Sequence, residues 1–315
     1  EIVGKLVDEA DIVVANLPPS TLKAMGLDYE TLSARNPRVI LTTVSAFGHG
    51  GPYSERVGFD GVVQAMSGAA YLTGQADGPT KSYAPWVDFG TAVLSAYGTI
   101  AALMGRQQTG KGQMVEGALL ATALNFFNFH LIEQDLRQTN RTAIGNRSPY
   151  AGPADCVQTK DGWIFVQVIG DPLFRRWAKL VGEEEWLSDP RFKNDLSRGE
   201  HGEVLSARTS QWAATRTTAE ALEALEAARL PAGPVYSPQQ ALDDPHIQAM
   251  NFMKPVDFPG LPKPAPLMDT PIKLSATPGG IRHRAPLLGE HTDDILADLG
   301  YSSDAIAKFR ADGVI

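Results

Sequence analysis

The chain has 315 residues, of which 43% are hydrophobic and 20% are charged, and its formal net charge at pH 7 is −8. A chain of this length and composition can bury a large core, and we expect two globular domains. The acidic balance argues against nucleic acid or an anionic membrane as a partner, and we see no apolar run as long as a membrane span. The single cysteine excludes an internal disulfide and fits a cytoplasmic location.

The first 140 residues alternate between predicted helices and strands. We expect a helix over 2–10, a buried strand over 10–17, short helices over 20–25 and 29–34, and a second buried strand over 39–44. A glycine-rich loop follows over 45–52. Because the chain opens within a helix, we also expect residues before Glu1. The order of strand, helix and strand predicts an α/β domain, whose ligands collect beyond the carboxyl ends of the strands.

The helix pattern that begins near Asp88 is the most regular in the chain. Pro85 and Gly105 suggest its limits, so that Asp88 lies at or near the N-cap. There its carboxylate would accept backbone N–H groups and be held ionised by the helix dipole. The simpler interpretation of Asp88 is a helix cap. Apolar residues recur every three or four positions and predict a stripe facing a core: Phe89, Val93, Ala96, Tyr97, Ile100, Leu103 and Met104.

Further predicted elements complete the chain. A helix over 58–68 and a loop over 72–85 precede the Asp88 helix, and a strand over 114–118 and a helix over 119–138 follow it. Residues 1–140 are thus predicted as the large domain, 141–153 as a linker and 154–254 as a smaller α+β domain. Six prolines between 255 and 271 predict an extended linker. Residues 272–315 are predicted to be helical again near their end and to return to the large domain.

No motif in the chain indicates a metal or a nucleotide. The six histidines lack the spacing of paired metal ligands, so we expect no catalytic metal. The stretch from Gly105 to Lys111 matches the first positions of a P-loop, but Gly112 stands where the motif needs Ser or Thr. The stretch also follows a helix and precedes a strand, the reverse of the required order. ATP hydrolysis is therefore excluded.

An ordered set of short stretches carries a resemblance to a known family. They include 10–16, 36–40, 45–48, 51–53, 58–60, 64–68, 87–88, 106–113, 161–163, 231–235 and 288–292. Together, over nearly the whole chain, they resemble the class III CoA-transferase family, also called the CaiB/BaiF family. The resemblance implies a Rossmann-like large domain with a parallel sheet, a smaller α+β domain and an interlocked homodimer. The family normally carries a further N-terminal segment, which this chain does not contain.

The resemblance implies an enzyme that moves CoA from an acyl-CoA thioester to a small carboxylic acid. An aspartate at the position of Asp88 is the nucleophile of the family, and it forms an aspartyl-acyl anhydride. An anhydride keeps enough free energy to re-form a thioester, whereas a serine ester would be a thermodynamic trap. Acyl-CoA is then a substrate, and no tightly bound cofactor is expected. The residues do not indicate which acids are exchanged.

Two other functions stay open at this point. A branch of the family consists of 2-methylacyl-CoA racemases, which use the aspartate together with a histidine at the position of Phe59. Phenylalanine cannot transfer a proton, so Phe59 favours transfer over racemisation. A non-catalytic CoA-binding relative is the third possibility. The intact Asp88 argues against it.

The resemblance also implies a set of CoA contacts. Each of these residues has a plain alternative as a turn former, a core residue or a solvated charge. Ala24 stands where the family often has arginine, which weakens the match around Met25. The implied contacts are Asn16, Leu17, Met25, Phe47, Arg56 and Phe59.

Overall fold

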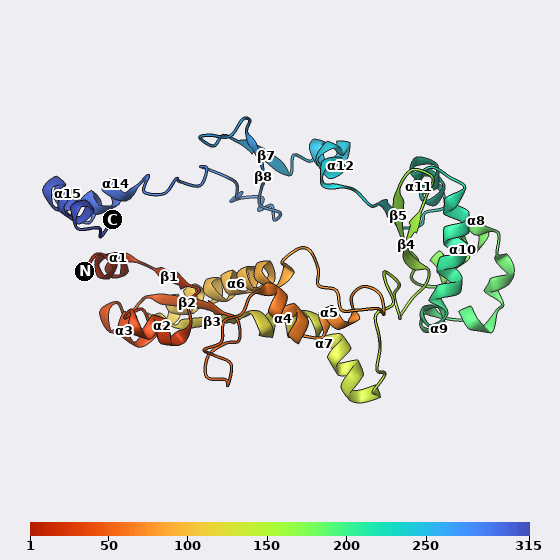
Figure 1. Cartoon of the computed structure of the whole chain (residues 1–315), viewed down its shortest axis with the longest axis horizontal. Coiled ribbons are helices and arrows are strands. Elements are labelled where there is room, and N and C mark those ends of the chain that lie inside the picture. Colours follow the sequence, from red (N-terminus) through yellow and green to blue (C-terminus); the bar gives the residue numbers. More distant parts are fainter. The chain divides into compact units, whose positions relative to one another are not determined.

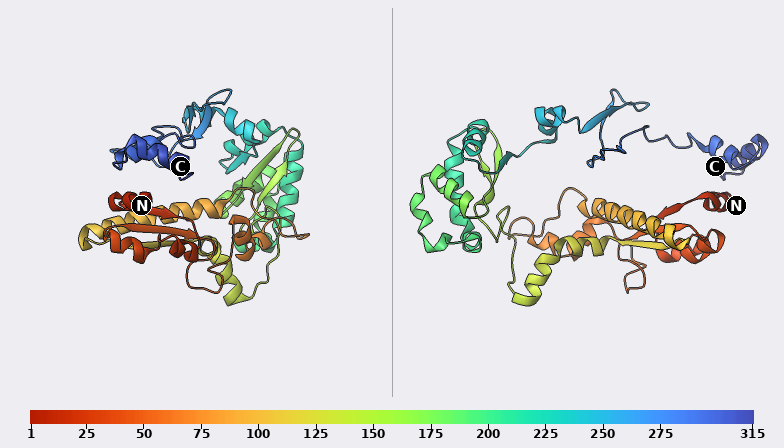
Figure 2. Two further views of the ribbon diagram at one scale, coloured as in Figure 1. Left: turned by 60° about the vertical axis from the view of Figure 1, so that its left-hand side comes forward. Right: turned by 180° about the vertical axis from the view of Figure 1, so that it is seen from behind.

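A computed structural model describes residues 1–315 and divides them into two compact units, 1–147 and 148–315. Each unit contains its own strands (Figures 1 and 2). Each also has its own buried core. The boundary between the units falls within the segment 141–153, for which composition predicts a linker. The two units are described separately below.

The first unit is built on a parallel sheet of three strands. Its order is β1 (Ile12–Ala15), β2 (Ile40–Ser45) and β3 (Met114–Ala118), with Val14 opposite Thr42 and Thr43 opposite Glu116. The predicted α/β class with a parallel sheet is therefore confirmed. The helices of this unit are α1 (Ile2–Glu9), α2 (Pro19–Ala24), α3 (Tyr29–Arg35), α4 (Asp60–Met66), α5 (Ala69–Leu72), α6 (Trp86–Thr109) and α7 (Leu119–Arg137).

The two strands predicted to be buried differ from each other. Strand β2 lies between two neighbours, and Ile40 and Leu41 are at most 1% exposed. Strand β1 has one neighbour only, and Val14 is 71% exposed. The prediction of a buried first strand is therefore wrong, because a β-branched run marks a strand but does not tell an edge strand from a central one.

Helix α6 turns its predicted apolar stripe outward. Phe89, Val93 and Tyr97 are each more than 60% exposed. The expectation that this stripe faces a core is wrong for the structure of this chain. The buried side of the helix instead carries mostly small or hydroxyl-bearing residues: Val87, Thr91, Ser95, Thr99, Ala102 and Arg106.

Close packing against the sheet explains the choice of face. A Cβ added to Gly117 of β3 would lie 2.4 Å from the Ser95 Oγ, and one added to Gly98 of α6 would lie 3.0 Å from Val115. Large side chains do not fit at this separation. The hydroxyls on this face find partners locally, since Thr99 donates to the Ser95 carbonyl at 2.7 Å.

The direction of α6 follows from the contacts of its last turns. Arg106, 7% exposed, donates to the carbonyls of Arg38 and Asp11 at 2.8 and 3.3 Å and to the Asp11 carboxylate at 2.7 Å. Asp11 and Arg38 precede β1 and β2, so the helix runs antiparallel to the strands. The helix passes the predicted end at Gly105 and stops at Thr109, where Gly110 takes a φ of 72°.

Helix α6 is also long and apolar enough to cross a membrane by length and composition alone. The expectation that no apolar run has that length is therefore wrong for this helix. The criterion is weak, because core helices of soluble proteins also meet it.

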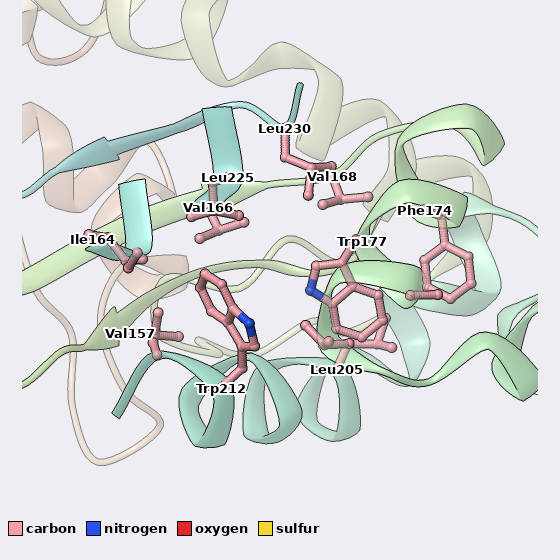
Figure 3. Close-up of a cluster of buried hydrophobic side chains, with 14 of the residues drawn as sticks. Val157, Ile164, Val166, Val168, Phe174, Trp177, Leu205, Trp212, Leu225 and Leu230 are labelled. Atoms are coloured by element: carbon pink, nitrogen blue, oxygen red, sulfur yellow. The ribbon is translucent and has the colours of Figure 1, made fainter. Parts of the chain in front are cut away.

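The second unit contains an antiparallel sheet in the order β4 (Ala154–Gln158), β5 (Trp163–Gln167) and β6 (Ala232–Pro234). Figure 3 shows Ile164 and Val166 of β5 near Trp212 and Leu225 within one apolar cluster. The helices packed around it include α8 (Asp171–Val181), α9 (Asp195–Glu200), α10 (Gly202–Ala214) and α11 (Thr218–Ala227), with short 3₁₀ turns over Glu184–Leu187 and Pro190–Phe192.

Part of the proline-rich segment 255–271 belongs to a hairpin. Composition predicts an extended linker, but β7 (Met253–Val256) and β8 (Ala265–Met268) pair as an antiparallel hairpin, with Pro255 opposite Pro266. A two-stranded sheet leaves edge positions where proline lacks no required donor. The remaining helices are α12 (Pro238–Asp243), α13 (Pro245–Ala249), α14 (Thr292–Asp298) and α15 (Ser303–Ala311). The predicted return of this tail to the first unit stays a prediction.

Candidate active site

The carboxyl ends of the parallel strands and the start of α6 share one edge of the first unit. Because α6 runs antiparallel to the strands, its N-terminus lies at their carboxyl ends. A buried cluster joins these parts: Ala46 follows β2, Val63 belongs to α4, Val87 to α6 and Leu119 to α7. Ligands of α/β proteins bind at this edge. The edge carries Asp88, the predicted nucleophile.

A second aspartate caps the helix that carries Asp88. The carboxylate of Asp60, a residue 7% exposed, accepts the backbone N–H groups of Val87 and Asp88 at 2.9 and 3.1 Å. Gln64 donates its Nε2 to the other oxygen of Asp60 at 2.5 Å and accepts the N–H of Ser82 at 2.9 Å. This buried network ties α4 and the loop before α6 to the first turn of α6.

Asp88 is therefore not the N-cap. Helix α6 begins at Trp86, the N-cap residue is Pro85, and Asp88 is the third residue of the helix. The prediction of a capping role is wrong, because Asp60 from another helix already binds the free N–H groups. The Asp88 carboxylate has no hydrogen-bond partner and is available to react with a substrate.

The surroundings of Asp88 raise the pKa of its carboxyl above the usual value. Partial burial is the larger cause, and the negative charge of Asp60 adds to it. The residue as a whole is exposed, so the neighbouring atoms of the first turn desolvate its carboxyl only in part. A carboxylate whose pKa is raised is a better base and nucleophile, in its ionised form, than a free aspartate.

The loop between β2 and α4 brings Phe47 and Arg56 together through Tyr53. The rings of Phe47 and Tyr53 meet edge to face at 5.8 Å, and the Arg56 guanidinium lies 3.8 Å above the Tyr53 ring. A Cβ at Gly58 would lie 2.7 Å from the Ala46 Cβ, so the loop closes on itself where only glycine fits. An aromatic face beside a cation suits an adenine or phosphate contact, and Tyr53 was absent from the predicted set.

The other predicted CoA contacts are less closely joined. Asn16, exposed, and Leu17, half-buried, directly follow β1 at the strand-end edge. Met25 is 58% exposed and lies at the far end of α2, about 9 Å along that helix. Phe59, 71% exposed, precedes the first residue of α4. Of the predicted CoA contacts, Phe47 and Arg56 are thus joined through Tyr53. Met25 makes no direct contact with either of them.

Sequence reasoning missed Asp60 and Gln64. Asp60 stands directly after Phe59 and opens α4, a position where an acidic residue ordinarily interacts with its own helix. Its actual partners lie 27 and 28 residues further along the chain. A motif read along one segment does not reveal such a pairing between two helices.

Comparisons with known proteins place the chain in a family. Residues 1–292 match CoA-transferase family III. The succinyl-CoA–D-citramalate CoA-transferase of Chloroflexus aurantiacus is 34% identical over 317 residues, which cover 100% of this chain and 79% of that protein. The formyl-CoA:oxalate CoA-transferase of Bradyrhizobium diazoefficiens is 32% identical over 340 residues, again covering 100% and 79%.

Solved structures share the fold. A CaiB/BaiF family protein from Brucella suis superposes with a TM-score of 0.81 at 30% identity, covering 95% of this chain and 78% of that one. Rv3272 from Mycobacterium tuberculosis gives the same TM-score at 24% identity and covers 93% of this chain and 79% of its own, a likeness of fold alone.

Proposed function

This chain belongs to CoA-transferase family III, and on that basis we propose that it moves CoA between two carboxylic acids through an aspartyl-acyl anhydride at Asp88. It is an enzyme of the CoA-transferase type, and a CoA thioester is its substrate. The observation that most supports the role of Asp88 is its free carboxylate, with a raised pKa, at the strand-end edge. We place the enzyme in the cytoplasm.

The proposed reaction begins at the Asp88 carboxylate. One of its oxygens attacks the thioester carbonyl, the carbon–sulfur bond breaks, and CoA leaves as the thiolate. The thiolate then attacks the Asp88 carbonyl and releases the donor acid, which leaves CoA as a thioester on Asp88. The acceptor carboxylate displaces CoA to form a second anhydride. A last attack by the thiolate on the acceptor acyl carbon yields the new acyl-CoA and restores the Asp88 carboxylate.

The proposed racemase alternative has less support from the residues at this edge. Racemisation needs a second group that returns a proton to the opposite face of the α-carbon. Phe59, at the position where the racemases carry histidine, has no titratable group. Asp88 thus lacks the partner that the racemase mechanism requires at that position.

An exchange assay tests the proposed reaction. We expect the purified protein to convert succinyl-CoA or formyl-CoA, offered with a panel of dicarboxylic and hydroxy acids, into the acyl-CoA of at least one acceptor. Liquid chromatography with mass spectrometry would detect the new thioester and the released acid. Exchange of the α-proton of a 2-methylacyl-CoA without transfer would support a racemase. CoA binding without either reaction would support a non-catalytic relative.

We further propose that the protein forms an interlocked homodimer. The exposed apolar side of α6 supports an extensive interface, because apolar patches of this kind on soluble proteins commonly mark contact sites. We expect Tyr97→Asp, which places a charge on this side, to convert the dimer to a monomer in analytical ultracentrifugation at micromolar concentration. Gln107→Asp, also exposed on α6, is the matched control and should stay dimeric. A stable folded monomer of the unaltered protein would contradict the proposal.

A further inference from the structure

The glycine-rich loop after β2 is held by side chains rather than by a strand partner. Gly48 and Gly50 both adopt positive φ, 80° and 78°, which ends regular pairing here. Two hydrogen bonds fix the first half of the loop. The Gly48 N–H donates to the Ser45 Oγ at 3.0 Å, and the His49 N–H donates to the Glu116 Oε1 at 2.6 Å. The acceptor of the second hydrogen bond, Glu116, belongs to strand β3 and lies 67 residues after His49 in the sequence.

Glu116 approaches the loop closely at Gly48. It lies on β3, and a Cβ at Gly48 would stand 3.1 Å from its Oε1. Its second oxygen lies 3.9 Å from the Nδ1 of His49. A hydrogen bond from a backbone N–H to an ionised carboxylate is among the stronger kinds. The Glu116 carboxylate therefore anchors the loop at His49 by a strong hydrogen bond.

The other hydrogen bonds that hold the loop lie at its two ends. The Leu120 N–H donates to the Ala46 carbonyl at 2.9 Å where the loop begins. Near its end, Glu55 accepts a hydrogen bond from the Ser20 hydroxyl. Phe47 also packs against the apolar cluster that contains Val63 and Val87. Glu116 adds the side-chain hydrogen bond by which a distant element holds the loop between Phe47 and Tyr53.

Glu116 also borders the helix that carries the nucleophile. It lines a cavity of about 200 Å³ together with Thr91 and Ser95 of α6 and Asn125 of α7. Thr91 is one helical turn after Asp88. Glu116 thus stands between the loop that carries the aromatic contacts and the helix that carries Asp88.

We propose that Glu116 is a positioning residue for acyl-CoA binding, which acts by holding the loop that presents Phe47, Tyr53 and Arg56. This role rests on the proposed function. Glu116 does not contact the reacting atoms; it sets the place of the groups that bind the nucleotide part of CoA. Its loss should therefore weaken substrate binding and leave the chemical step at Asp88 intact.

Three substitutions of Glu116 separate positioning by a hydrogen bond from an effect of charge. Glu116→Gln keeps a side-chain oxygen at the same reach and can accept the His49 N–H. Glu116→Asp keeps the charge but is one methylene too short, and Glu116→Ala removes both. We expect KM for acyl-CoA to rise roughly tenfold for Ala and Asp, with kcat within about twofold, and to stay near the original value for Gln. Glu223→Ala, an exposed glutamate of α11, is the control.

A second readout does not depend on catalysis. Hydrogen exchange followed by mass spectrometry should show faster exchange over residues 46–52 in the Ala and Asp variants, and unchanged exchange in the Gln variant. Absence of transfer activity in every protein, together with this exchange pattern, would overturn the proposed function and keep the loop-holding role. Unchanged exchange and unchanged KM in Glu116→Ala, or an equal fall in kcat and kcat/KM, would overturn the positioning role.

Discussion

Asp88→Asn is expected to lower CoA transfer by several orders of magnitude, because the amide lacks the oxygen anion that attacks the thioester. Wild-type protein incubated with a donor acyl-CoA should carry an adduct on Asp88 that hydroxylamine converts to a hydroxamate. The variant should form none. Peptide mass spectrometry and a thioester exchange assay measure the two effects.

The fold of Asp88→Asn should be unaffected. Asp60, not Asp88, binds the free N–H groups of α6, so the substitution removes no cap. The raised pKa of Asp88 means that its ionised form opposes folding at pH values above that pKa, and asparagine removes this cost. The loss of a negative charge near the helix start acts the other way, by about 0.3–1 kcal/mol. We therefore expect nearly unchanged stability, also for Asp88→Ala. Near wild-type transfer by the asparagine variant would show that another group is the nucleophile.

Asp60→Ala is expected to have the largest effect on stability. It leaves the N–H groups of Val87 and Asp88 and the Gln64 amide without their acceptor in a buried place. Lost capping and unsatisfied buried donors together should cost about 2–4 kcal/mol in the free energy of unfolding. Urea unfolding measures this. Asp304→Ala, an exposed acidic residue in the first turn of α15, is the control and should change stability little.

Asp60→Asn tests the electrostatic part of the same contact. Asparagine keeps a side-chain oxygen for the helix start but lacks the charge that helps to raise the pKa of Asp88. The pKa of Asp88 should fall, and the acidic limb of the profile of kcat/KM against pH should move to lower pH. An unchanged limb, with unchanged stability in Asp60→Ala, would mean that Asp60 neither caps α6 nor acts on Asp88.

Local signals in the sequence sufficed for most elements of this protein. Proline at the start of α2 and a Thr217–Glu220 capping box at the start of α11 mark helix beginnings through contacts a few residues long. The β-branched run of β2 marks a strand in the same way. The parallel sheet of the first unit followed from the alternation of such elements, and the family followed from motifs spread along the chain.

The features that depend on packing between distant segments were decided by the tertiary structure alone. The periodicity of α6 correctly indicated a helix but chose the wrong face, because close approach to Gly117 admits only small side chains on the sheet side. The capping role passed from Asp88 to Asp60, which comes from another helix. Segment 255–271 has a proline-rich composition, yet pairing between β7 and β8 orders it. Each of these outcomes depends on contacts between residues that are far apart in the sequence. Patterns within one short segment do not predict such contacts.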